Sequence, residues 1–161
     1  MLAALERVAL AATRALSVVG LVALMGLAAM TLADGLLRWV ANHPIEGVRD
    51  LGGLAIAVAI ACCLPVGLME RANITIRLGK GSIGRGLEAL ASTAVCVALG
   101  LAAWQFWLYA EKMARARETT FVLQIPIAPF WYGVDVILWL AVLVQAIVVL
   151  RDWVQIFDDA A

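Results

Sequence analysis

Three long runs of residues without a charged side chain, and a fourth run with a single one, dominate this sequence. Residues 15–33 and 51–69 each hold 19 consecutive uncharged residues, and residues 89–110 hold 22. In a fourth run of 21, residues 130–150, Asp135 is the only charged residue. A helix needs about 20 mainly apolar residues to cross the hydrocarbon core of a bilayer. The runs therefore predict four transmembrane helices, and no stretch alternates for long enough to build a closed barrel instead.

The composition supports an apolar surrounding for the whole chain. Hydrophobic residues make up 65% and charged residues 15%, and the mean hydropathy is +0.98. Soluble domains contain about 45–50% apolar and about 25% charged residues. A soluble fold of 161 residues cannot bury this much apolar surface, which argues against a soluble enzyme. The net charge is zero, so nothing indicates a nucleic-acid partner.

Short connections between the runs leave no room for a second domain. We predict a single all-α membrane domain, residues 1–161, of four tilted transmembrane helices surrounded by membrane lipids. The predicted spans are about 15–37, 44–69, 87–110 and 130–151. We expect the first to be retained, because its apolar run is longer than the roughly 7–15 residues of a signal-peptide core.

The second span is predicted to begin early. Asn42 or His43 can cap a helix, Pro44 suits the first helical position, and Glu46 would fall in the first turn. A helix from Pro44 to Met69 would be about 39 Å long at ~1.5 Å per residue. This exceeds the ~30 Å hydrocarbon core, so the pattern predicts an extended, tilted second helix.

Basic residues indicate the orientation, because cytoplasmic segments carry an excess of Lys and Arg. The side that would hold both termini carries seven basic residues: Arg7, Arg14, Arg71, Arg77, Lys80, Arg85 and Arg151. The other side carries five: Arg38, Arg49, Lys112, Arg115 and Arg117. The count favours both termini in the cytoplasm. Most aromatic residues cluster toward the predicted outer side: Trp39, Trp104, Trp107, Tyr109, Trp131 and Tyr132.

Small residues recur every four positions in two spans, where they would let helices approach closely. They are Gly53, Ala57 and Ala61 in the second span, and Ala94, Ala98 and Ala102 in the third. We expect these stripes to pack against other helices of this chain or of a partner.

Charged residues near the outer ends of the spans are the candidate functional residues: Asp34, Arg38, Arg49, Asp50 and Asp135. Arg38 follows Asp34 by four residues, so the two can pair on one helix face. One hypothesis makes Asp34 and Asp135 carriers of ions or protons, since an ionisable residue inside a span is a functional candidate. The other, which we favour, makes these charges structural or part of a partner interface. The sequence offers no nucleophile–base pair, so we predict no catalytic, cofactor or metal site.

A glycine motif at residues 79–84 matches the dinucleotide pattern G-x-G-x-x-G. The fingerprint also requires a βαβ unit and an acidic residue about 20 positions further on. Here a membrane span follows, and residues 101–107 contain no acid. We interpret this segment as a flexible, basic cytoplasmic turn.

Three short segments resemble the small permease subunit of tripartite ATP-independent periplasmic (TRAP) transporters. In residues 34–51, Arg38 closes the first span, Asn-His-Pro-Ile forms the next turn, and Asp50 stands where that family more often has Glu. Residues 70–76 are similar to the family's His-Ile-x-Val-Asp segment, with Asn73 in place of the His. Residues 119–126, followed by Trp131, resemble its Thr-rich stretch and Ile-Pro before the fourth span.

The resemblance implies a role that composition alone does not. It implies a non-catalytic subunit in the bacterial inner membrane that joins a large multi-span permease. A periplasmic solute-binding protein would deliver a small organic anion, and a sodium gradient would drive its import. Substrate and sodium sites would belong to the large subunit, while this chain would widen the static scaffold and offer outer surface to the binding protein.

A different class of membrane protein is the alternative interpretation. A small four-span exporter could act as a proton-coupled homodimer with Asp34 or Asp135 as its proton site. Such transporters usually place the carboxylate near the middle of a span, whereas both of these residues lie near span ends.

Overall fold

The computed structural model of the chain describes residues 2–70 and 82–158. They form four helices, α1 (Leu2–Ala41), α2 (Val48–Met69), α3 (Ser82–Ala116) and α4 (Ala128–Asp158). Each is long and apolar enough to cross a membrane. Within these two ranges the only β-type pairing is an isolated bridge between Thr119 and Pro126. The prediction of an all-α protein with four membrane helices is confirmed.

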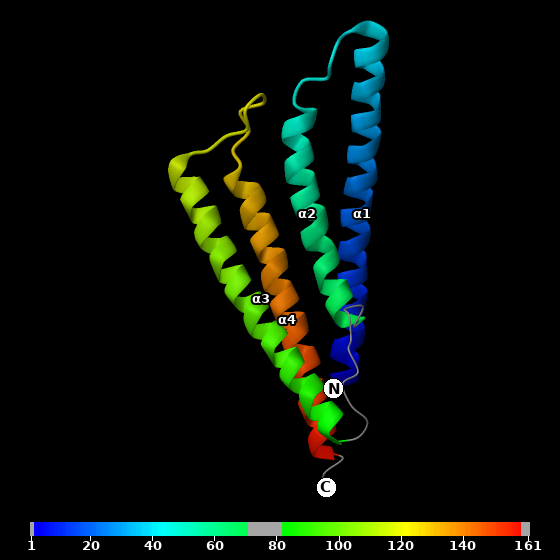
Figure 1. Cartoon of the computed structure of the whole chain (residues 1–161), viewed down its shortest axis with the longest axis vertical. Coiled ribbons are helices and arrows are strands. Elements are labelled where there is room, and N and C mark those ends of the chain that lie inside the picture. The colour runs from blue at the N-terminus through cyan, green and yellow to red at the C-terminus, as the bar shows by residue number, and fades with distance from the viewer. Residues whose placement is uncertain (1, 71–81, 159–161) are drawn as a thin grey trace.

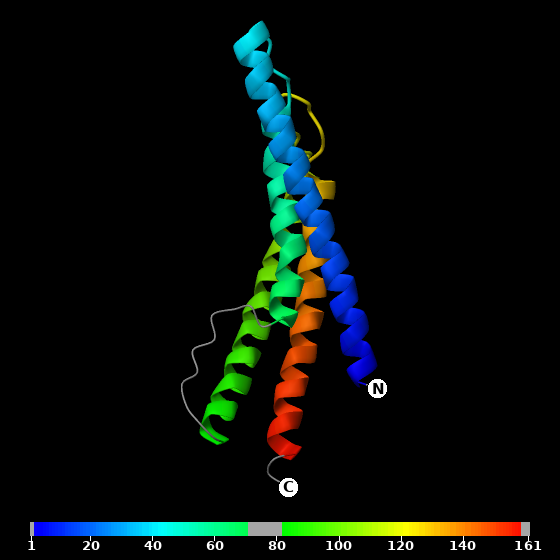
Figure 2. The ribbon, with the colours of Figure 1, turned by 90° about the vertical axis from the view of Figure 1, so that its right-hand side faces the viewer.

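The helices pair as two antiparallel hairpins, α1 with α2 and α3 with α4 (Figure 1). The hairpins meet where α2 packs along α4, so the principal contacts run in the order α1, α2, α4, α3. Both termini lie at one end of the molecule, which we call the terminal end (Figures 1 and 2). Residues 42–47 and 117–127 connect the helices at the opposite end, which we call the loop end.

The second helix does not start near Pro44, contrary to the sequence-based prediction. It begins at Val48, and Gly47 at its N-cap has a left-handed backbone with φ of 85°. Asn42, with φ of 52°, follows the last residue of α1, a position where Asn often ends a helix. Asn42 therefore terminates the first helix instead of capping the second, and Pro44 and Glu46 lie in the connection.

The relative helix lengths also differ from the prediction. α2 is the shortest helix, with 22 residues, whereas α1, α3 and α4 contain 40, 35 and 31. At ~1.5 Å per residue α1 is about 60 Å long, well beyond the ~30 Å hydrocarbon core. The extended helices are thus the first, third and fourth, and they must tilt or project into the water on both sides.

A regular seam joins α3 to α4. Buried residues of α4 recur at alternating intervals of four and three: Val134, Leu138, Ala141, Gln145, Val148 and Asp152. On α3 the fully buried alanines are Ala89, Ala103 and Ala110, which lie on one seven-residue repeat. This is the spacing of coiled-coil packing. Near the terminal end the seam is polar, since Ser92 Oγ donates to Asp152 Oδ2 at 2.7 Å and Gln145 Nε2 donates to the Ser92 carbonyl at 3.1 Å.

The small-residue stripes are only partly used within the chain. Ala61 is buried in the core beside Ala103 and Val134. Gly53 is exposed, and so are Ala94, Ala98 and Ala102. The third-span stripe that the sequence suggested therefore faces outward, while α3 packs through a different face.

A glycine allows a close approach of α1 to α2. A Cβ atom added at Gly20 would lie 2.8 Å from Cys62 Cβ and 3.0 Å from the Ala59 carbonyl oxygen. Toward the terminal end, Arg14 pairs with Glu70 at 2.7 Å. α1 packs mainly along α2, and many of its large apolar side chains remain exposed, among them Val18, Val22, Met25 and Leu32.

Candidate functional site at the loop end

The Asp34 carboxylate ties the end of α1 to the loop that follows it. Its Oδ1 atom accepts a hydrogen bond from the backbone N–H of Ile45 at 2.6 Å. Its Oδ2 atom accepts one from Arg38 at 3.0 Å, so the Asp34–Arg38 pair expected from their spacing is present. The contact with Ile45 was not anticipated. It fixes the 42–47 connection against α1.

Asp50 makes the equivalent contact with the other loop. Its Oδ2 atom accepts hydrogen bonds from the backbone N–H groups of Val122 and Leu123, at 2.7 and 3.1 Å. A carboxylate from the first turn of α2 therefore binds the connection between α3 and α4, more than 70 residues away in sequence. Charge-assisted bonds of this kind are roughly twice as strong as neutral ones.

Residues 118–127 fold into a tight hairpin that receives the Asp50 contact. Thr120 N–H donates to the Ile125 carbonyl at 3.0 Å, and Ile127 N–H donates to the Glu118 carbonyl at 3.1 Å. The Thr120 hydroxyl accepts from Ile125 N–H at 3.1 Å. The hairpin's backbone donors are thus largely satisfied by its own residues and by Asp50.

Gly47 allows the two loops to touch. An added Cβ at this position would overlap the side-chain carbons of Leu123, and the positive φ also disfavours any other residue. Leu123 therefore packs directly on the backbone just before α2. Together with Asp50, this contact joins the two connections into one body.

A cleft of about 330 Å³ opens beside the hairpin. Its lining comes from α2, α3, the hairpin and the start of α4: Asp50, Gly53, Leu54, Tyr109, Met113, Glu118, Thr119, Thr120, Phe121, Ile127 and Trp131. It therefore combines carboxylates with aromatic rings.

Aromatic side chains meet between α3 and α4, and two of them, Tyr109 and Trp131, line this cleft. The ring centroid of Trp131 lies 5.2 Å from that of Tyr109, in an edge-to-face arrangement, and 5.8 Å from that of Phe106. Trp107 and Tyr132 form another edge-to-face pair at 5.6 Å. Tryptophan and tyrosine favour the headgroup level of a bilayer, so this group indicates where α3 and α4 leave the hydrocarbon.

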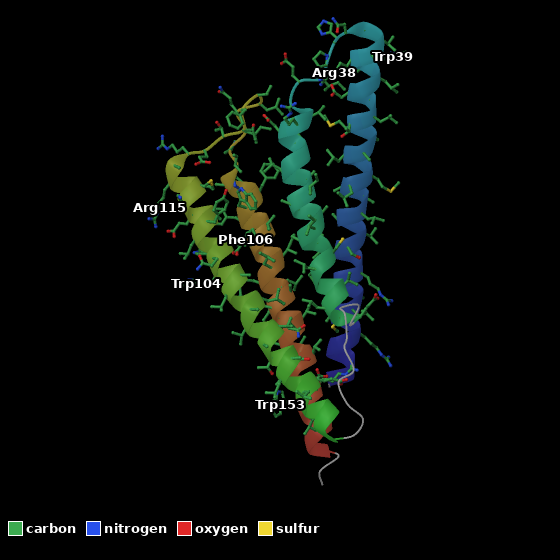
Figure 3. All side chains as sticks on the ribbon, in the orientation of Figure 1. Arg38, Trp39, Trp104, Phe106, Arg115 and Trp153 are labelled. Carbon is green, nitrogen blue, oxygen red and sulfur yellow. The ribbon has the colours of Figure 1, made fainter. Side chains whose placement is uncertain are left out.

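The tip of the hairpin is apolar and open to solvent. Phe121 is 99% exposed, and Val122 beside it is also exposed. Trp39, at the loop end of α1, is 84% exposed (Figure 3).

The remaining two candidate residues do not join this arrangement. Arg49 is exposed and, among the contacts of the described chain, makes no ion pair. Asp135 lies in the second turn of α4 and is only 1% exposed, with an Oδ1 atom that has no hydrogen-bond partner in the described residues. The structure thus brings Asp34 and Asp50 to two linked loops but leaves Asp135 inside the helix packing.

A comparison with known protein families shows the family to which this chain belongs. Residues 27–155 match the family model described as tripartite ATP-independent periplasmic transporters, DctQ component. The match covers about four fifths of the sequence and parts of all four helices. The chain belongs to this family. It is therefore a small, multi-pass membrane subunit of a TRAP transporter. No curated protein and no solved structure gave a significant match.

Residues 2–70 and 82–158 contain no group of three or more side chains that could hold a metal ion. Of the glycine motif at 79–84, the first three positions lie outside the described residues, and Gly84 belongs to the first turn of α3. The loop end is a surface built from backbone contacts and apolar side chains, which suits recognition of another protein.

Proposed function

We propose that this subunit is the non-catalytic scaffold of a sodium-driven secondary transporter that imports a small organic anion across the bacterial inner membrane. It joins a large multi-span permease and receives a periplasmic solute-binding protein at the loop end. The match to the family over residues 27–155 carries the proposal. Both termini and the connection between α2 and α3 lie in the cytoplasm, in agreement with the basic-residue count.

The exposed surface of the helices supports a partnership within the membrane. α1 buries little of itself inside the chain, and its apolar side chains face outward along its length. The alanines at 94, 98 and 102 form a second outward face on α3. Small residues on an open stripe allow a neighbouring helix to approach closely, so these faces suit a membrane partner.

Affinity purification from native membranes tests the partnership. The chain should bring down one large hydrophobic permease, and the complex in liposomes should take up its solute only with the binding protein and a sodium gradient. The purified chain alone should move no solute. Proton-driven transport by the chain alone, as a homodimer, would establish the exporter interpretation instead.

A further inference from the structure

The hairpin at 118–127 combines a fixed backbone with an exposed apolar tip. Asp50 binds the N–H groups of Val122 and Leu123, and Leu123 rests on Gly47, so the residues around the tip are held by α2. Phe121 itself contributes nothing to this support, since its side chain is 99% exposed. The fold thus presents a large aromatic side chain at a defined position without using it internally.

The tip stands outside the hydrocarbon layer. Arg115, in the last turn of α3, lies six residues beyond Tyr109, which places it about 9 Å further along the helix axis at ~1.5 Å per residue. The last turns of α3 and the start of the hairpin also carry charges of both signs: Glu111, Lys112, Arg115, Arg117 and Glu118. Figure 1 shows the hairpin projecting past the ends of α3 and α4. Lipid tails therefore do not cover Phe121.

We propose that the hairpin tip is the anchor by which this subunit holds the solute-binding protein, with Phe121 entering an apolar pocket on that soluble partner. The inference rests on the proposed function and adds the residues that perform it. Binding energy at protein interfaces concentrates in a few aromatic or Arg side chains, and a held loop loses little conformational freedom when it binds. Both conditions are met at residue 121.

The direction of the hairpin favours the soluble partner over the large permease. A membrane partner lies beside the helices and reaches this chain across its apolar faces. A soluble partner approaches from beyond the loop end, where the hairpin and the longer projecting end of α1 are both open to it (Figure 1). The cleft next to the tip, lined by Glu118, Tyr109 and Trp131, would accept a basic side chain of the binding protein, because carboxylates and aromatic faces both attract cations.

Affinity of the complex for the binding protein tests the anchor directly. The purified complex of small and large subunits in nanodiscs is titrated with the binding protein. Phe121→Ala should raise Kd about tenfold or more, while Phe121→Tyr should stay within about threefold. Trp104→Ala is the matched control, since Trp104 is an exposed aromatic residue lower on α3 (Figure 3). It should leave Kd unchanged.

A double-variant cycle tests the part played by Asp50, which is a positioning residue. Asp50→Ala should weaken binding and should also speed hydrogen exchange at the N–H groups of Val122 and Leu123. Phe121→Ala should then add less than about twofold in the Asp50→Ala background, because the anchor is no longer held. Full additivity of the two changes would contradict a role through the hairpin.

Photo-crosslinking identifies the neighbour independently of any loss of affinity. A benzophenone-bearing phenylalanine analogue at position 121 should crosslink to the binding protein, and the same analogue at position 104 should not. Crosslinking to the permease or to lipid alone, or an unchanged Kd for Phe121→Ala, would overturn the anchor. If the unmodified complex fails to bind any binding protein, the proposed function fails instead, so the two failures are distinguishable.

Discussion

At the loop end, the carboxylates of Asp34 and Asp50 accept more hydrogen bonds from backbone N–H groups than from cationic side chains. Asp34 binds the N–H of Ile45, and Asp50 binds those of Val122 and Leu123. Hydrogen bonds to a charged group contribute about 1.5–3 kcal/mol, whereas exposed ion pairs contribute about 0–1 kcal/mol. We treat the Asp34–Arg38 pair as an exposed ion pair, because the Arg38 side chain is 60% exposed. The Asp34 side chain is only 14% exposed.

Asp34 should therefore matter more than Arg38, although the sequence singles out both. We expect Asp34→Ala to lower stability by about 1–3 kcal/mol, because Ile45 N–H loses its acceptor and the connection to α2 loosens. Arg38→Ala should cost less than about 1 kcal/mol. Thermal unfolding of the purified chain in detergent measures both. Equal losses would mean that the ion pair, and not the backbone contact, holds this loop.

Asp135 separates the structural and ion-carrying hypotheses. Its carboxyl is buried in the helix packing, and Oδ1 is without a partner in the part of the chain that is described. Asn is nearly the same size, so Asp135→Asn should preserve folding and assembly. We also expect uptake by the complex to keep the shape of its sodium dependence, because the proposed function places the coupling ions in the large subunit. A changed Hill slope with intact complex would show that this chain carries an ion site.

At the scale of helices, backbone proximity decides where α1 meets α2. Gly20 lies where an added methyl group would be 2.8 Å from Cys62 Cβ and 3.0 Å from a backbone oxygen of α2. Neither neighbour is the end of a flexible side chain, so one helix has to move. The next glycine on α1, Gly26, has nothing within 4 Å of an added Cβ.

These two glycines give a matched pair of variants on one helix. Gly20→Ala should destabilise the chain by about 1–3 kcal/mol through overpacking. Gly26→Ala should be neutral or slightly stabilising, since Ala favours helix over Gly by ~1 kcal/mol. Unfolding in detergent, monitored by the reactivity of the buried Cys62 thiol, measures the stability of both variants. Early exposure of Cys62 in both variants would argue against Gly20 as the specific contact.

On the scale of the whole molecule, the chain forms two helix pairs, α1 with α2 and α3 with α4, which are joined along α2 and α4. This leaves α1 and α3 with open apolar faces. Such an arrangement places the loops together at one end and the termini at the other (Figures 1 and 2). The proposed partners therefore require that the loop end face the periplasm.

Reporter fusions check this orientation. A fusion after Arg117 should behave as periplasmic, and a fusion after Gly81, between α2 and α3, should behave as cytoplasmic. The basic count of seven against five predicts this result. The opposite pattern would place the hairpin in the cytoplasm and remove the binding protein as its partner.

The number of helices could be predicted from the sequence, because the thickness of the bilayer fixes the length of an apolar span. Uncharged runs of about 20 residues predict the number of helices, and the spacing of Asp34 and Arg38 predicts their pair. The packing faces were not predictable in the same way: alanine is common in all spans, so Ala94, Ala98 and Ala102 look as suitable as Ala89, Ala103 and Ala110. The second helix start was also missed, because Asn42 and Pro44 fit either the end of one helix or the beginning of the next.

The sequence by itself determined a membrane protein of four helices, since hydropathy and length act locally and need no knowledge of neighbours. Only the tertiary structure decided what the loop-end carboxylates do. Asp50 meets Val122 across 72 positions, and the groups that it binds are backbone N–H groups, which every residue except proline carries. No pattern of side chains marks such a donor in advance. The partner of Asp50 is set by how the two helix pairs, α1 with α2 and α3 with α4, pack against each other.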